Sequence, residues 1–217
     1  KPDGSYDFES LDAVDIKGFN GDLKKLIDGD LVRLPIFDFI KGKRKYPIVG
    51  LKNNKDQPII VEGIHGLNNL LLPEISRDKV FKIYISALTQ LNIDNHNRVR
   101  TTDARLIRRI VRDSNYRGHD AIKTISMWKN VRDGEEHNIF PFQEEADVMF
   151  NSALVYELAV LKKHVEPLLM AIDDTTREYI EARRLLKLLS NFISIENECH
   201  ILKNSVLREF IGGSCHI

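Results

Sequence analysis

The stretch with the most distinctive chemistry is Arg98–Arg117, which reads RVRTTDARLIRRIVRDSNYR. It holds seven arginines and two aspartates, so its local charge is 7 − 2 = +5 in a chain whose formal net charge is zero. On a helix, spacings of three and four place four arginines on one face: Arg105, Arg108, Arg109 and Arg112. A guanidinium is a planar, charged fork that suits phosphate oxygens. The stretch therefore indicates a site for a polyphosphate.

Two other interpretations of this stretch stay open. The arginines could belong to a salt-bridged surface helix, although the stretch carries too few acids to neutralise them. They could also contact RNA, but only Tyr116 is interleaved as a stacking aromatic. The neutral overall charge also argues against a general polyanion binder. We therefore expect no nucleic-acid partner.

A second candidate for chemistry is one carboxylate, Glu62, which comes after the apolar run Ile59–Val61 and precedes Gly63 and Gly66. A short apolar run without alternation is typical of a strand buried on both faces of a parallel sheet. Ligands bind beyond the carboxyl ends of such strands, so Glu62 would project into the crevice and could hold a metal ion near a phosphate. The alternative is a solvated loop residue or a helix cap.

The elements that must position these residues alternate between strands and helices. Strands are expected over Leu31–Leu34, Ile59–Val61, Val80–Ser86, Ala146–Phe150 and Ile193–Leu202, with an exposed hairpin or loop tip at Lys41–Lys45. Helices are expected over Phe19–Ile27, Thr102–Ser114, Ala121–Val131, Leu154–Ile172 with Ser152 as its cap, and from a capping box at Thr175–Glu178 to about Leu189. This order predicts an α/β layered fold. No repeat or low-complexity linker divides the chain, so a single domain over residues 1–217 is expected.

The two cysteines, Cys199 and Cys215, form no metal-binding spacing and no disulfide framework. A reducing, cytoplasmic location is therefore expected. No apolar run approaches the roughly 18 residues of a membrane span, so no membrane partner is expected.

Taken together, these residues resemble the uridine kinase and phosphoribulokinase family of P-loop kinases. The resemblance covers roughly residues 6 to 170, in the family's order. It is carried by Phe8-Glu9 with Asp12 and Asp15, Pro35–Phe39, Val61–Ile64, Arg108–Asp113, Tyr116–Gly118 and Ala146–Val148. The ending, which fits the pattern NSxLREFIGG, looks like that of a longer bacterial branch of this family.

The resemblance implies a P-loop kinase-like three-layer fold with a mostly parallel sheet and a helical lid that bears arginines. It implies transfer of the γ-phosphate of ATP to a hydroxyl of a nucleoside or similar small molecule. The implied cofactors are ATP and Mg²⁺, and the implied partners are ATP and the small-molecule acceptor. It leaves a homo-oligomer open. The alternatives are a relative that keeps the fold and only binds or regulates, and an RNA-binding module that uses the arginine helix.

The resemblance also implies roles for individual residues. Glu62 would hold Mg²⁺ near the phosphates, and Arg112 and Arg117 would act as lid arginines that neutralise charge on the transferred group. Around the acceptor, Glu9 would accept hydrogen bonds from hydroxyls, Arg109 would contact the substrate, Phe8 and Phe37 would form the pocket wall, and His119 would occupy a substrate-binding position.

The sequence also departs from the family's pattern. No GxxxxGK[ST] loop occurs in it, and neither does the family's catalytic aspartate. We expect both upstream of Lys1, and we expect this piece to be inactive by itself. Uridine-reading positions have changed as well, with Phe37 in place of tyrosine, Gly42 of histidine, His119 of arginine and Met127 near an expected glutamine. Weak recognition of uracil is expected, because base specificity depends on paired polar groups.

Overall fold

The computed structural model describes residues 10–38, 43–54 and 56–216. The chain forms two compact units, one of residues 1–84 and 134–148 and the other of residues 85–133 and 149–217. It passes between them within strand β5 (Ile83–Ser86), helix α3 (Ala121–Asn138) and strand β6 (Val148–Asn151). The single kinase-like domain expected over residues 1–217 stays a prediction.

The first unit begins with helix α1 (Ile16–Asp28), which matches the predicted helix. Asp15 caps it by accepting a hydrogen bond from the Gly18 amide at 2.9 Å. The helix ends at Gly29, whose φ of 84° is left-handed and suits a residue without a side chain. Leu23 and Leu26 are buried, so the apolar face of the helix supplies much of this unit's small core.

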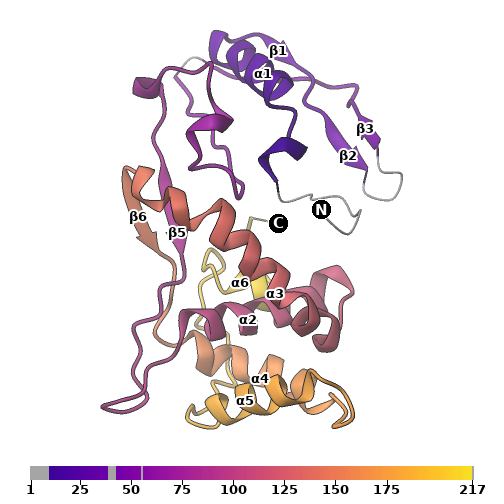
Figure 1. Ribbon diagram of the computed structural model, residues 1–217, viewed down its shortest axis with the longest axis vertical. Helices are drawn as coiled ribbons and strands as arrows, with labels where there is room; N and C mark the ends of the chain where they lie inside the picture. Colours follow the sequence, from indigo (N-terminus) through magenta and orange to yellow (C-terminus); the bar gives the residue numbers. More distant parts are fainter. Residues whose placement is uncertain (1–9, 39–42, 55, 217) are drawn as a thin grey trace. The chain divides into compact units, whose positions relative to one another are not determined.

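Two small antiparallel sheets belong to the first unit (Figure 1). Strand β1 (Leu31–Val32) pairs with β4 (Leu51–Lys52), and β2 (Ile36–Asp38) pairs with β3 (Lys43–Lys45). The second pair confirms the hairpin interpretation of the basic segment, of which residues 41 and 42 lie outside the described residues.

The buried strand predicted at Ile59–Val61 is wrong. The segment is irregular and pairs with no strand in the described part of the chain. The side chains are exposed to an extent that excludes a core position, 88% for Ile60 and 41% for Val61. An apolar run becomes a buried strand only where neighbouring strands take its hydrogen bonds and a second layer covers its face. The described residues provide neither here.

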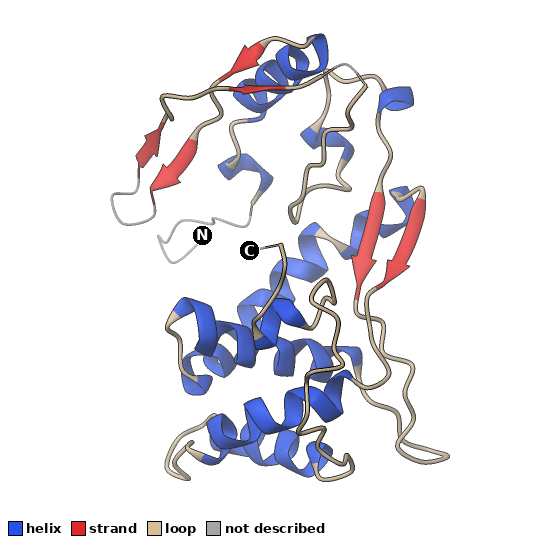
Figure 2. Cartoon of the chain, turned by 180° about the vertical axis from the view of Figure 1, so that it is seen from behind, coloured by secondary structure: helices blue, strands red, loops and turns tan. Residues whose placement is uncertain are grey.

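Strands β5 and β6 form the third sheet, close to where the sequence predicts two strands. The amide of Asp147 donates to the Lys82 carbonyl at 2.9 Å, and that of Ser152 donates to the Ser86 carbonyl at 2.9 Å. The residue numbers increase in the same direction along both strands. The strands are therefore parallel, as Figure 2 shows. All the sheets in the described residues are two-stranded. The larger, mostly parallel sheet of the expected three-layer fold is not among them.

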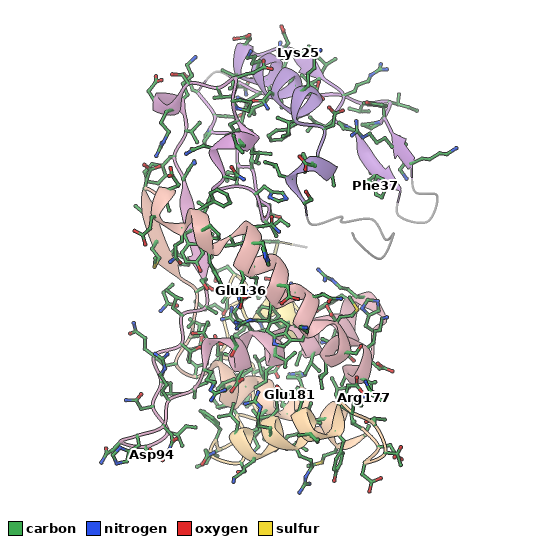
Figure 3. The ribbon with its side chains drawn as sticks, viewed as in Figure 1. Lys25, Phe37, Asp94, Glu136, Arg177 and Glu181 are labelled. Atoms are coloured by element: carbon green, nitrogen blue, oxygen red, sulfur yellow. The ribbon has the colours of Figure 1, made fainter. Side chains whose placement is uncertain are left out.

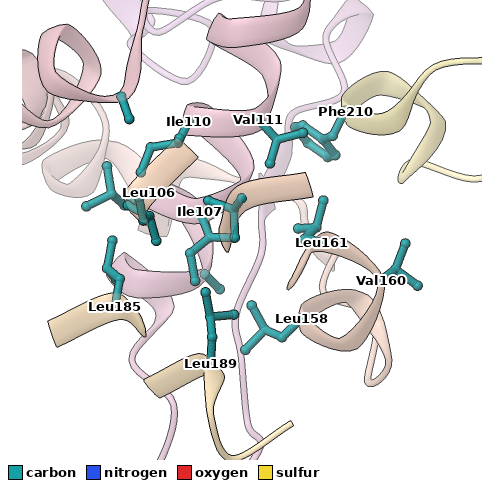
Figure 4. Packing of buried hydrophobic residues seen from close by; sticks show 14 of the residues in the cluster. Leu106, Ile107, Ile110, Val111, Leu158, Val160, Leu161, Leu185, Leu189 and Phe210 are labelled. Carbon is teal, nitrogen blue, oxygen red and sulfur yellow. The ribbon is translucent and has the colours of Figure 1, made fainter. Parts of the chain in front are cut away.

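The second unit is mostly helical (Figure 2). It contains α2 (Thr101–Arg112), α4 (Glu157–Met170), α5 (Tyr179–Leu189), α6 (Arg208–Ile211) and most of α3. The α2 face predicted to be apolar is buried in one cluster with residues of α4 and α5 (Figure 4): Leu106, Ile107, Ile110 and Val111. Within the described residues, no helix combines the length and apolar character that a membrane crossing requires.

The strand predicted at Ile193–Leu202 is also wrong, because the segment is an irregular loop that lies along α4. The amide of Ile195 donates to the Ala159 carbonyl at 3.0 Å, and Nζ of Lys163 donates to the Glu196 carbonyl at 2.8 Å. Contacts from the neighbouring helix thus satisfy loop groups that a sheet would otherwise have paired.

Two predicted caps are corrected as well. Helix α4 begins at Glu157, and its start has no side-chain cap from Ser152. Helix α5 begins at Tyr179 without the capping box expected at Thr175–Glu178, because Asp173 accepts the hydrogen bond from the Thr175 amide at 2.9 Å. Both errors concern local polar groups that found other partners.

A buried ion pair joins α2 to α4. Nε of Arg108 donates to Oε1 of Glu157 at 3.1 Å, and Nη2 donates to Oε2 of Glu157 and to the Ser152 carbonyl. The side chains are only 9% and 3% exposed. The interpretation of Arg108 as one of four arginines on a shared ligand-facing surface is therefore corrected, because its charge is neutralised inside the core.

We expect Glu157→Gln to lower the free energy of unfolding by about 3 to 5 kcal/mol, because it leaves the buried Arg108 charge without its partner. Urea denaturation followed by circular dichroism measures the change. The control is Glu166→Gln on the same helix, whose carboxylate is more exposed and lies 3.6 Å from Lys162. Equal stability of the two variants would contradict a structural role for the pair.

Candidate anion-binding site

The candidate site lies at the carboxyl end of α2, where the helix changes its winding. The chain continues from Arg112 into a π-helical turn, Asp113–Arg117. Gly118 ends this turn with a left-handed φ of 64°, and its amide donates to the Asp113 carbonyl. A π-helical turn is rare and often occurs at functional sites. Here it returns the chain so that Arg117 lies beside Asp113.

One carboxylate lies at the centre of three arginines. The Asp113 side chain is 1% exposed. Nε of Arg109 lies 3.2 Å from its Oδ2, Nε of Arg112 lies 3.7 Å from its Oδ1, and Nη1 of Arg117 lies 3.5 Å from the same Oδ1. From α3, the Thr124 hydroxyl donates to Oδ2 at 3.3 Å. We call Arg109, Arg112 and Arg117 the arginine cluster.

The arginine cluster carries more positive charge than its acids balance. Three guanidiniums against Asp113 leave 3 − 1 = +2, and Glu209, with Oε1 3.4 Å from Nη1 of Arg112, reduces this to +1. Burial lowers the pKa of the Arg109 guanidinium, and the charges of Arg112 and Arg117 lower it further, while Asp113 opposes them. Arginine still stays protonated at neutral pH, so a bound anion would relieve this repulsion.

The cluster is accessible to a ligand. The Arg112 and Arg117 side chains are 25% and 48% exposed. In the described residues, the buried Nε atoms of Arg109 and Arg112 make no hydrogen bond despite their proximity to Asp113. The exposed guanidinium groups of Arg112 and Arg117 can donate hydrogen bonds to the oxygens of a phosphate.

The other predicted site residues are distributed over the chain. His119 lies beside the π-helical turn, and its amide donates to the Asp113 carbonyl at 3.2 Å. Phe37 lies on β2 in the first unit and is 46% exposed (Figure 3). Glu62 is an exposed residue of the same unit. Phe8 and Glu9 lie outside the described residues. The structure thus brings Arg109, Arg112, Arg117 and His119 together within the second unit.

Glu62 is the candidate for contact with a metal ion. No group of three or more histidine, cysteine, aspartate or glutamate side chains that could hold a metal occurs within residues 10–38, 43–54 and 56–216. Magnesium in phosphoryl-transfer sites typically binds one or two carboxylates together with substrate phosphates. One exposed carboxylate fits such a shared site better than a metal site built from protein ligands alone.

Three residues of this site were not predicted from the sequence: Asp113 as its centre, Thr124 and Glu209. For Asp113 a signal existed, because it lies four residues after Arg109 and four before Arg117. Glu209 lies 97 positions from Arg112, and only the packing of the chain brings the two together.

Comparison with known proteins places these residues in a family. The model of the phosphoribulokinase / uridine kinase family matches residues 2–159. The chain belongs to this family. Residues 160–217, which include α5 and α6, lie beyond the matched region.

Relatives in this family bear the names of kinases. The chain is 33% identical to "Uridine kinase" of Borrelia turicatae (strain 91E135) over an alignment of 155 residues that covers 67% of this chain and 66% of that protein. It is 30% identical to "Uridine kinase" of Clostridium botulinum (strain Kyoto / Type A2), over 65% of this chain and 61% of that protein. It is also 30% identical to mouse "Uridine-cytidine kinase-like 1", over 67% of this chain and 23% of that protein. The alignment thus spans just under two thirds of the first relative's length.

We expect inorganic tripolyphosphate to raise the melting temperature of this 217-residue chain at low ionic strength, because the anion neutralises the arginine cluster. Arg112→Gln and Arg117→Gln should each reduce the shift, and 0.5 M NaCl should suppress it. Differential scanning fluorimetry measures it. The control is Arg183→Gln, which removes an exposed arginine of α5. Equal shifts in all these variants would place the anion elsewhere.

Proposed function

We propose that the full-length protein is an ATP-dependent kinase that transfers the γ-phosphate of ATP to a hydroxyl of a nucleoside or similar small molecule. Membership of the phosphoribulokinase / uridine kinase family supports a kinase. The names of the relatives support a nucleoside acceptor. The observation that carries the proposal is the arginine cluster, whose excess positive charge at the end of α2 suits a polyphosphate.

Phosphoryl transfer requires positioning and neutralisation of charge more than covalent chemistry by the protein. In the proposed mechanism Arg112 and Arg117 donate to oxygens of the transferred group as charge develops on them. Arg109, held by Asp113, addresses the acceptor side. A magnesium ion bound with the nucleotide would neutralise phosphate oxygens, and Glu62 is the proposed carboxylate that holds it.

We assign four residues to the proposed acceptor pocket. Glu9 would accept hydrogen bonds from acceptor hydroxyls, and Phe8 and Phe37 would form its apolar wall. His119, adjacent to the arginine cluster, would face the acceptor or its phosphorylated product. These assignments rest on the family's motif positions in this chain.

We also propose that the full-length protein completes a three-layer fold around the parallel β5–β6 pair. Apolar side chains of this pair are exposed, with Ile85 at 63% and Phe150 at 58%. Ile60, in the segment predicted as a strand, is 88% exposed. Additional sheet and helical layers would remove this apolar surface from water.

The residues at the expected base-recognition positions lack the polar groups that would hydrogen-bond to a base. Phe37 lacks a hydroxyl, and Met127 of α3 lacks an amide. Each missing hydrogen bond to a base edge costs on the order of 1 kcal/mol, and more where a partner stays buried and unpaired. We expect phosphorylated product with a weak preference for uridine over other hydroxyl-bearing acceptors.

The test is release of ADP by the full-length protein with uridine, cytidine, sugar phosphates and non-nucleoside polyols. We expect turnover, with kcat/KM for uridine within about tenfold of the best alternative acceptor, because the polar groups that would discriminate are few. The 217-residue chain, whose sequence has no GxxxxGK[ST] loop, should give no appreciable turnover. Binding of tripolyphosphate without ADP release by the full-length protein would instead indicate a member of the family that binds and does not catalyse.

We expect Glu62→Gln in the full-length protein to lower kcat by about 100-fold or more, because the amide keeps the size of the side chain and removes the charge that magnesium needs. The melting temperature should change little, since Glu62 is exposed. The control is Asp56→Asn, another exposed acid of the first unit. Early melting with normal turnover would show that Glu62 is structural.

A further inference from the structure

The C-terminal segment, Ser205–Gly213, contacts the arginine-bearing part of the second unit although it lies outside the region that the family model matches. It contains α6, which packs against α2. The family-matched part of the chain therefore does not account for every residue around the arginine cluster.

This segment is anchored by buried groups. Leu207 is fully buried and Phe210 is 5% exposed, and both belong to the core cluster of the second unit. The Phe210 ring, shown in Figure 4, lies beside this core, and its centroid is 5.2 Å from Cζ of Arg108, a cation–π contact. Nη2 of Arg208 donates to the carbonyls of Ile201 and Glu198 at 2.7 and 2.9 Å. The backbone of α6 is thus held in place without any contribution from Glu209.

From this fixed position the segment contacts the arginine cluster and its π-helical turn at three residues. Oε1 of Glu209 lies 3.4 Å from Nη1 of Arg112. Nδ2 of Asn115 donates to the Phe210 carbonyl at 2.8 Å. A Cβ atom on Gly212, which has a φ of 87°, would lie 3.0 Å from the Tyr116 hydroxyl, so the backbone passes close to the turn.

We propose that Glu209 is a positioning residue, which orients Arg112 for the transferred phosphate, and that the C-terminal segment is part of the phosphate site of this protein. The proposal rests on the proposed kinase function. Arginine has five donors on a rigid plane. Nε of Arg112 lies 3.7 Å from Oδ1 of Asp113 and Nη1 lies 3.4 Å from Oε1 of Glu209, so two carboxylates restrict the guanidinium plane, and in the proposed site Nη2 would donate to a phosphate oxygen.

The exposure of the Glu209 side chain distinguishes a role in positioning Arg112 from a role in stabilising the fold. Its side chain is 53% exposed, and ion pairs of this kind contribute little to folding. Holding Arg112 in one orientation, in contrast, removes conformational freedom that the guanidinium would otherwise lose when it binds the anion. A change at Glu209 should therefore affect catalysis more than it affects the melting temperature.

The first experiment measures steady-state kinetics of the full-length protein with ATP and uridine. We expect Glu209→Ala to lower kcat roughly 3- to 10-fold, with KM for uridine and the melting temperature nearly unchanged, because misorientation of one group affects the reacting geometry. Glu209→Gln should restore most of the rate, since its amide oxygen still accepts from Arg112. The matched control is Glu196→Ala, which removes an exposed glutamate in the loop after α5.

A double-mutant cycle then tests whether Glu209 acts through Arg112. In an Arg112→Gln background, Glu209→Ala should have no further effect on kcat. Asn115→Ala, which unties the π-helical turn from the Phe210 carbonyl, should lower kcat in the same direction as Glu209→Ala.

Three results would overturn the positioning role while leaving the proposed function intact. These are additive effects of the Glu209 and Arg112 substitutions, a kcat of Glu209→Ala equal to or above that of the wild type, and an equal loss in Glu196→Ala. In the same cycle, a lower kcat of Arg112→Gln would support the proposed phosphate site independently of Glu209. Unchanged turnover of Arg112→Gln would refute that site and the positioning role with it.

Discussion

The second unit depends on how buried carboxylates balance the charge of an arginine-rich helix. Helix α2 places apolar residues in the core, including Ile107 and Ile110 with no exposed surface, and its arginines must lie next to them. An arginine side chain stays charged at neutral pH. Each arginine near the core must therefore pair with an acid or extend into water. Asp113 supplies that acid for three of them.

The two buried carboxylates have different consequences. Glu157 takes one arginine, Arg108, in a closely paired and nearly dry geometry, which neutralises it and joins α2 to α4. Asp113 is shared among three guanidiniums, at distances of 3.2 to 3.7 Å, and cannot neutralise them all. Helix α2 therefore carries a structural arginine, Arg108, and two arginines that Asp113 neutralises only in part, Arg109 and Arg112.

The region beyond the family match contributes to this arrangement from two sides. Arg184 of α5 donates hydrogen bonds to both carboxylate oxygens of Asp103 of α2, at 2.7 and 2.8 Å. Phe210 of α6 closes the core beside Arg108, and Glu209 reaches Arg112. The arginine-bearing helix thus packs against α4, of which only the first three residues fall within the family match, and against elements that come after it. Its position depends on the whole second unit.

The sequence by itself determined the features that local periodicity and local charge dictate. The apolar face of α2, the end of α1 at Gly29 and the β2–β3 hairpin were predictable, because spacing and glycine act within a few residues. The surplus of arginines and the ordered motifs also indicated the family before any comparison. The roles of Glu62, Arg109, Arg112, Arg117 and the acceptor residues stay predictions.

Only the tertiary structure decided which arginines are available and which apolar runs are strands. Arg108 and Arg112 share one face of the helix. Arg108 is nevertheless neutralised by the buried Glu157, 49 positions away, whereas Arg112 contacts the exposed Glu209, 97 positions away. Ile59–Val61 has the composition of a buried strand but no pairing partner in the described residues, and the loop at Ile193–Leu202 bonds to α4 instead of a sheet. Charge neutralisation and strand pairing both require a second group from elsewhere in the chain, and sequence periodicity contains no information on which group that is.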